Sequence, residues 1–244
     1  MALARYFGPI VVGVAVYFGA KAYFVDGARP MGPEEIERQL MATPAAGAIT
    51  VLRERAPEDH ARVLAALADA SRGRPDPQAA AEALQETVAE LIRERAPDIR
   101  RAPQRSVVRV IEGQLAILDA LRGDPATCGR VALRGTAEIG RAQRAEIAPV
   151  AADAAADVLE AIYEGRDSTT PDIARPSELD LTEVIRGWQR RGATPEQIDL
   201  ILAPSYTNPE FCSAVIGFLT YLSRNEGVSA KRVRTDLVVS MLEG

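Results

Sequence analysis

Two cysteines, Cys128 and Cys212, are the only thiols in this chain of 244 residues. Each stands three residues after a proline, Pro125 or Pro209, and is therefore expected on the first turn of a helix. In an exported domain two thiols most simply form one disulfide, which would close a loop of about 85 residues. Two buried free thiols are a second interpretation. A redox pair is a third, because a helix N-terminus lowers the pKa of a thiol, although the Cys-x-x-Cys spacing is missing.

Four arginines, Arg130, Arg134, Arg141 and Arg144, follow one another at spacings of four, seven and three residues. A continuous helix would carry them on one side, where they would form an anion-binding face. Anionic lipid headgroups or an acidic partner protein would be its ligands. The alternative is a solvated face whose arginines pair with neighbouring acids.

The C-terminal residues 227–237 read GVSAKRVRTDL. This string is similar to the turn and recognition helix of bacterial helix-turn-helix repressors. The resemblance implies that Ser229, Lys231, Arg232 and Arg234 contact a DNA groove or its phosphates. The preceding segment departs from the repressor pattern, because it carries bulky aromatic residues. The alternative is a C-terminal helix that buries its apolar face, which accounts for the same residues. We do not expect nucleic acid as a partner.

The sequence contains few residues for metal binding or hydrolytic catalysis. His60 is the only histidine, so a metal site with several imidazoles or a hydrolytic triad could use at most this one residue. We expect His60 on a solvated helical turn. No nucleophile elbow, phosphate-binding loop or dinucleotide-binding glycine motif is present. Four acidic residues lie near the linker predicted at residues 166–176: Asp172, Glu178, Asp180 and Glu183. They lack the spacing of a calcium loop and suit helix capping better. The sequence therefore assigns no catalytic, cofactor-binding or metal-binding residue.

Helices must position all of these side chains. Aromatic residues make up 5% of the chain and alternating β-branched runs are absent, so the fold class is predicted to be all-α. Prolines that follow a capping side chain mark helix starts, and two pairs have the spacing of a capping box. The expected stripes of apolar residues include Val107, Ile111, Leu115 and Leu118. The prolines are Pro77, Pro125, Pro195 and Pro209, and the capping-box pairs are Thr194 with Gln197 and Asp180 with Glu183.

The N-terminus carries an apolar run over residues 6–20, preceded by one charge at Arg5. Extended to Val25, the run approaches the roughly 20 residues that cross a bilayer. We therefore expect a transmembrane anchor, with membrane contact through residues 6–25. A cleaved signal is the alternative, because Ala20-Lys21-Ala22 suits signal peptidase, and a buried core helix is a third interpretation.

The predicted organisation is an anchor or signal at 1–25, a larger helical domain at 26–165, a linker at 166–176 and a C-terminal helical subdomain at 177–244. The helices are expected to form an irregular bundle, with a division into two sub-bundles as the alternative. Without Arg5 and Lys21, 27 of the 29 basic residues remain against all 34 acidic ones, a net charge of −7. Such a body has no overall attraction to nucleic acid.

Three functional hypotheses follow. The first is a protein-interaction or assembly module on the periplasmic side of a bacterial inner membrane, with an unidentified membrane or periplasmic protein as partner. The second is a membrane-anchored cytoplasmic DNA-binding regulator that uses the C-terminal helices. The third is an enzyme of a class without recognisable motifs.

Overall fold

The computed structural model describes residues 32–72, 77–136 and 139–243, and every regular element in these ranges is helical. The all-α prediction is confirmed for this part of the chain. The first helices are α2 (Pro33–Leu40), α3 (Ala46–Arg55), α4 (Pro57–Arg72) and α5 (Pro77–Arg95). The middle of the chain forms a short 3₁₀ helix η2 (Ala96–Arg101), then α6 (Gln104–Ala120), α7 (Pro125–Arg134) and α8 (Arg141–Arg166). The last helices are α9 (Glu178–Arg190), α10 (Pro195–Leu202), α11 (Phe211–Arg224) and α12 (Val228–Glu243).

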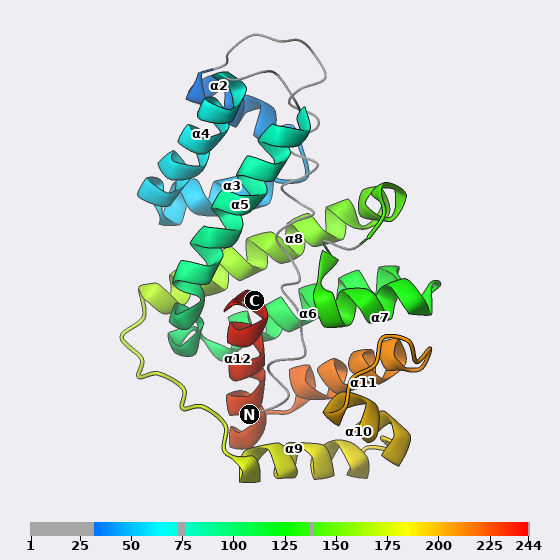
Figure 1. The fold of residues 1–244 in the computed structure, drawn as a ribbon. Helices are drawn as coiled ribbons and strands as arrows, with labels where there is room; N and C mark the ends of the chain where they lie inside the picture. Colours follow the sequence, from blue (N-terminus) through cyan, green and yellow to red (C-terminus); the bar gives the residue numbers. More distant parts are fainter. Residues whose placement is uncertain (1–31, 73–76, 137–138, 244) are drawn as a thin grey trace.

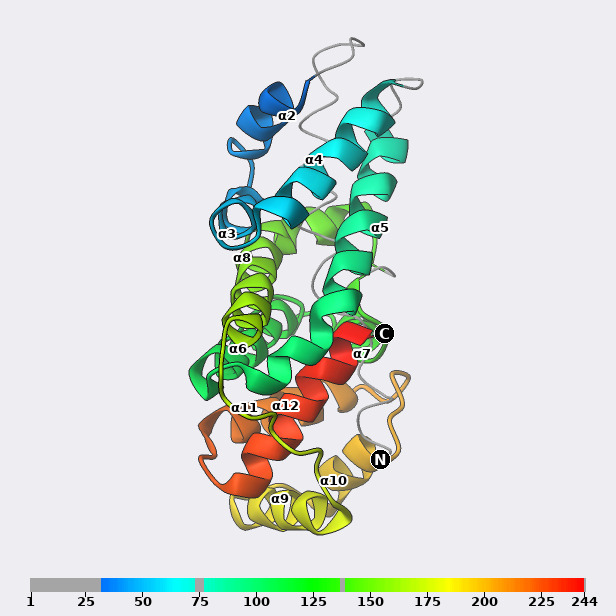
Figure 2. The same ribbon diagram turned by 90° about the vertical axis from the view of Figure 1, so that its left-hand side faces the viewer.

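The helices build an elongated body (Figure 1). The helices α2 to α5 gather at one end, α9 and α10 lie at the other end, and α6, α7 and α8 lie between them. The helix α12 runs along the body from α9 towards α5, as both ribbon views show (Figure 2). Helices such as α6 bury one apolar face and carry polar residues on the other, whereas α12 is buried on most of its sides.

The most extensive helix packing joins α6 to α8. Val107, Ile111 and Leu118 of α6 are buried as the stripe predicted. The alanine-rich part of α8 lets α6 approach closely, because a Cβ atom on Gly113 would stand 2.8 Å from the Cβ atom of Ala154. Small residues at this crossing therefore set the distance between the two helices.

The predicted linker coincides with a non-helical stretch over residues 167–177. This stretch contacts η2, because the Ile173 backbone amide donates a 2.8 Å hydrogen bond to the Arg100 carbonyl. The C-terminal helices also pack against helices that precede the linker: α11 packs on α6 and α7, and α12 packs on η2 and α6. The two predicted helical domains thus share one hydrophobic core, which includes Leu118 before the linker and Phe218 after it.

Helix starts follow the proline signals at Pro77, Pro125 and Pro195. The Thr194 and Gln197 capping box is confirmed, because the Thr194 hydroxyl accepts from the Gln197 amide at 3.2 Å.

Two predicted helix starts need correction. The helix α11 begins at Phe211 and not at Pro209, because Asn208 accepts from the Glu210 amide at 2.9 Å and forms a turn first. The cap of α9 is Ser177 paired with Asp180, so Asp180 is the third helical residue and not the cap.

The predicted membrane anchor or signal, residues 1–25, lies outside the described residues. Within the described ranges no helix is long and apolar enough to span a membrane.

Candidate functional site

The structure brings the two cysteines together. Cys128 lies on the first turn of α7, which begins at Pro125 as predicted. Cys212 lies on the first turn of α11, although that helix begins at Phe211 and not at Pro209. Their sulfur atoms lie at bonding distance, and their Cα atoms are 5.6 Å apart although 84 residues separate them in sequence. Both side chains are buried. In this structure they are therefore a disulfide that joins the middle helices to the C-terminal ones.

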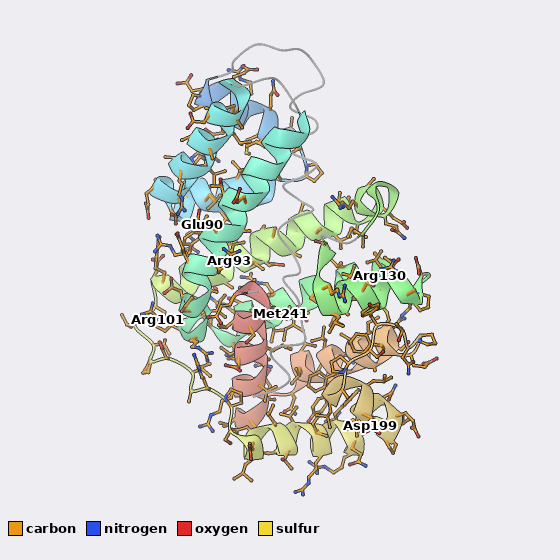
Figure 3. The ribbon with its side chains drawn as sticks, in the orientation of Figure 1. Glu90, Arg93, Arg101, Arg130, Asp199 and Met241 are labelled. Carbon is orange, nitrogen blue, oxygen red and sulfur yellow. A yellow bond between two sulfur atoms is a disulfide. The ribbon has the colours of Figure 1, made fainter. Side chains whose placement is uncertain are left out.

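The four arginines of the predicted anion-binding face do not lie on one continuous helix. The helix α7 ends at Arg134, and α8 begins at Arg141. Between them Gly135 has a φ of 79°, a left-handed conformation that glycine tolerates and that ends α7. The set is therefore divided between two helices, with Arg130 on α7 (Figure 3).

Three of these arginines make contacts within the chain. Arg130 donates to the Thr127 hydroxyl at 2.7 Å. The Arg134 guanidinium lies 4.7 Å from the centre of the Tyr206 ring, and Arg144 donates through Nε to a backbone carbonyl at 2.9 Å. The side chain of Arg141 is outside the described part of the chain. Anion binding by this set stays a prediction.

The segment that resembles a recognition helix forms the start of α12, and two of its four predicted DNA contacts face α9. The buried Ser229 hydroxyl lies 2.7 Å from an Asp180 oxygen and 2.6 Å from a Glu183 oxygen. Arg232 lies 3.3 Å from the same Asp180 carboxylate. These contacts hold α12 against α9.

Arg234 is completely buried. Its Nη1 atom donates to the carbonyl oxygens of Leu222 and Asn225 at 3.1 and 3.0 Å, which accept at the end of α11. Burial lowers the pKa of this guanidinium. Lys231 is half exposed and lies 3.4 Å from Glu226. Because Ser229 and Arg234 are buried, α12 would have to leave its neighbours before these two residues reached DNA.

Asp180 is the most strongly perturbed carboxylate in this region. The backbone amide of Ser177 and the hydroxyls of Ser229 and Ser177 donate to it, and they hold its pKa far below the ordinary value. Asp180 therefore stays ionised and joins the start of α9 to α12. Among residues 32–72, 77–136 and 139–243, no three His, Cys, Asp or Glu side chains converge to hold a metal ion.

His60 lies on the first turn of α4, as predicted, but it is 9% exposed and not solvated. Its Nε2 atom lies 3.7 Å from a Glu37 oxygen of α2. The neighbouring Asp59 is also buried and accepts from the Tyr163 hydroxyl at 3.0 Å. Burial, and then the negative charge of Asp59, raise the pKa of Tyr163. These groups connect α2, α4 and α8.

A pocket of about 610 Å³ lies between α9 and α11. Its lining includes Arg190 and Arg191 from the end of α9 and Arg224 from the end of α11, beside Trp188 and Tyr221. Sequence reasoning did not single out these residues. The available signal was the arginine doublet at positions 190 and 191, but only the fold places Arg224 at the same pocket.

Arginine guanidinium groups can bind an oxyanion through paired N–H donors. The pocket is therefore a candidate ligand site in the described part of the chain. Comparison of the chain with protein-family models, with curated proteins and with solved structures finds no match.

Proposed function

We propose that this chain is a membrane-tethered binding module whose helical body works on the periplasmic side of a bacterial inner membrane. The observation that carries the proposal is the contact between Cys128 and Cys212. Disulfides persist in oxidising compartments and are rare where glutathione and thioredoxin keep thiols reduced. A buried pair at bonding distance on two different helices is therefore typical of an exported domain.

The apolar run at residues 6–20 supplies the proposed tether. The disulfide would fix α11 against α7, and α11 supplies part of the pocket wall. The bridge thus supports α11, one of the two helices that would receive a ligand or partner. The partner in this proposal is a membrane or periplasmic protein or a ligand presented there.

A pair of reporters fused after Gly244 tests the location. An alkaline phosphatase that is active only in an oxidising compartment should be active, and a fluorescent protein that folds only in the cytosol should stay dark. Deletion of residues 6–25 is the matched control and should reverse both signals. A bright cytosolic reporter on the full-length chain would contradict the proposal.

A further inference from the structure

The pocket between α9 and α11 has the size of a small-molecule site. Its volume of about 610 Å³ falls within the range of about 300 to 1,000 Å³ that such ligands occupy. Trp188 lines the pocket with a small part of its ring, because the residue is only 5% exposed. Its ring meets Phe218 edge to face with centroids 5.3 Å apart. Gly217 leaves room beside that ring, since a Cβ atom there would be 3.5 Å from Trp188 Cζ2.

Three arginines at this pocket have no acidic partner among the described residues. Arg190, Arg191 and Arg224 all line the pocket, and none of their side chains forms an ion pair or a hydrogen bond within that part of the chain. Their placement in the last turns of α9 and α11 suits the helix dipoles. The dipole does not explain why arginines of two helices line the same pocket without an acidic partner. A bound anion would supply that partner.

The one acidic residue at the pocket is already compensated. Glu226 lies 3.4 Å from the Lys231 amine and 3.8 Å from the Arg234 guanidinium. Two positive charges therefore face its carboxylate from α12. The net charge that the pocket presents to a ligand is positive.

A neutral donor stands beside the arginines. The Tyr221 hydroxyl accepts a 2.6 Å hydrogen bond from the Asn225 side chain. Its own proton has no acceptor among the described residues and stays available to a ligand. Gly187 makes this position possible, because a Cβ atom there would overlap the Tyr221 hydroxyl.

We propose that this pocket binds a small organic anion in which a phosphate or carboxylate group is attached to a planar apolar part. The guanidinium groups of Arg190, Arg191 and Arg224 bind the oxyanion, with paired N–H donors that match its geometry. The planar part lies next to the small part of Trp188 that the pocket leaves exposed. This inference rests on the binding role proposed above but not on the periplasmic location.

Trp188 is the only tryptophan of the chain, so its fluorescence reports on the pocket directly. The full-length chain in a neutral detergent is titrated with phenyl phosphate and, separately, with phenylsuccinate. We expect a saturable change in Trp188 fluorescence with one or both anions and none with benzyl alcohol, which lacks the charge. The response to one anion and not the other identifies the oxyanion as phosphate or carboxylate.

Matched variants separate the pocket from general surface charge. Arg190→Gln and Arg224→Gln should each weaken binding about tenfold, since each removes charge-assisted hydrogen bonds. Arg186→Gln is the control, because Arg186 is also an exposed, unpaired arginine of α9 within the described chain but does not line the pocket. Its affinity should equal that of the wild type.

Three results would overturn the inference: no saturable response to either anion, equal affinity in Arg190→Gln and wild type, or equal weakening in Arg186→Gln. Thermal unfolding of each variant checks the fold, and Arg190→Gln at the exposed end of α9 keeps the test valid if Arg224→Gln unfolds. Binding is measured on the purified chain and location in cells. A failure of this inference is thus distinguishable from a failure of the proposed function.

Discussion

The buried guanidinium of Arg234 donates through Nε to the Gln104 side-chain oxygen at 2.7 Å, which joins α12 to the first turn of α6. The same Gln104 donates to the Thr235 hydroxyl at 3.1 Å. Because Arg234 also binds two carbonyl oxygens at the end of α11, one side chain connects three helices. This network fixes the C-terminal helices on the rest of the body.

Arg234→Leu is predicted to lower the free energy of unfolding by about 3 kcal/mol. The change removes the donor to the Gln104 oxygen and to the Asn225 carbonyl, and one of two donors to the Leu222 carbonyl. Loss of one member of a buried polar network costs about this much. Urea denaturation measures the effect. Arg186→Leu on the exposed face of α9 is the control and should change stability by less than about 0.5 kcal/mol. Equal stability of Arg234→Leu and wild type would contradict the assignment.

The contacts of Asp180 predict a pH dependence. Amide and hydroxyl donors lower its pKa in the folded chain, so the unfolded chain takes up the proton more readily. The stabilisation is therefore complete above the ordinary aspartate pKa of about 3.9 and is lost as the pH falls below it. The difference in urea midpoint between wild type and Asp180→Asn should be constant from neutral pH down to about 5 and shrink below about 4.

Asp199→Asn is the matched control for this profile, because the Asp199 side chain is exposed on α10 and makes no ion pair or hydrogen bond in the described chain (Figure 3). The urea midpoint of Asp199→Asn should equal that of the wild type at every pH. A difference between wild type and Asp180→Asn that stays constant down to the lowest pH at which the chain folds would refute the account of Asp180.

The crossing of α6 and α8 predicts a size limit at Gly113. Gly113→Val places methyl groups against Ala154 and should destabilise the chain by about 2 kcal/mol through overpacking. Ala154→Gly in the same chain should restore part of the loss, because it removes the facing Cβ atom. Ala120→Val at the exposed end of α6 controls for the lower helix propensity of valine. Thermal unfolding compares the four chains, and no recovery in the double variant would contradict the proposed contact.

Local signals were sufficient to predict much of this fold. Pro125 and Pro195 fixed helix starts because proline fits the first helical position whatever the tertiary structure. The apolar stripe of α6 could be predicted because burial of one helix face gives the apolar residues a helical spacing in the sequence. Asn208 shows where local reasoning fails, since its side chain closes a turn that delays α11 by two residues relative to Pro209.

The candidate sites were less predictable for a physical reason. The helix placement of each cysteine could be read from its proline, but the approach of α7 to α11 depends on packing across 84 residues. Arg130 and Arg141 would share one helix face only if a helix continued through Gly135. The positive φ of Gly135 ends that helix, so the two arginines lie on different helices. Arg190 and Arg224 are 34 positions apart in the chain and meet at one pocket only through tertiary structure.

The bridge between Cys128 and Cys212 should also stabilise the chain, by about 3 to 5 kcal/mol for a loop of this length. Cys212→Ser is expected to lose this amount in urea denaturation under oxidising conditions. In the presence of a reductant the wild type should lose the same stability and match the variant. A wild-type chain that is insensitive to reductant would contradict the structural role of the bridge.

The redox state of the two cysteines in living cells tests the central claim most directly. Cells that produce the full-length chain are quenched with acid, and free thiols are then labelled with a maleimide of high mass before electrophoresis. The account predicts no mass shift without reduction and a shift of two labels after reduction, because Cys128 and Cys212 are bonded in an oxidising compartment. Two labels on the unreduced chain would contradict it.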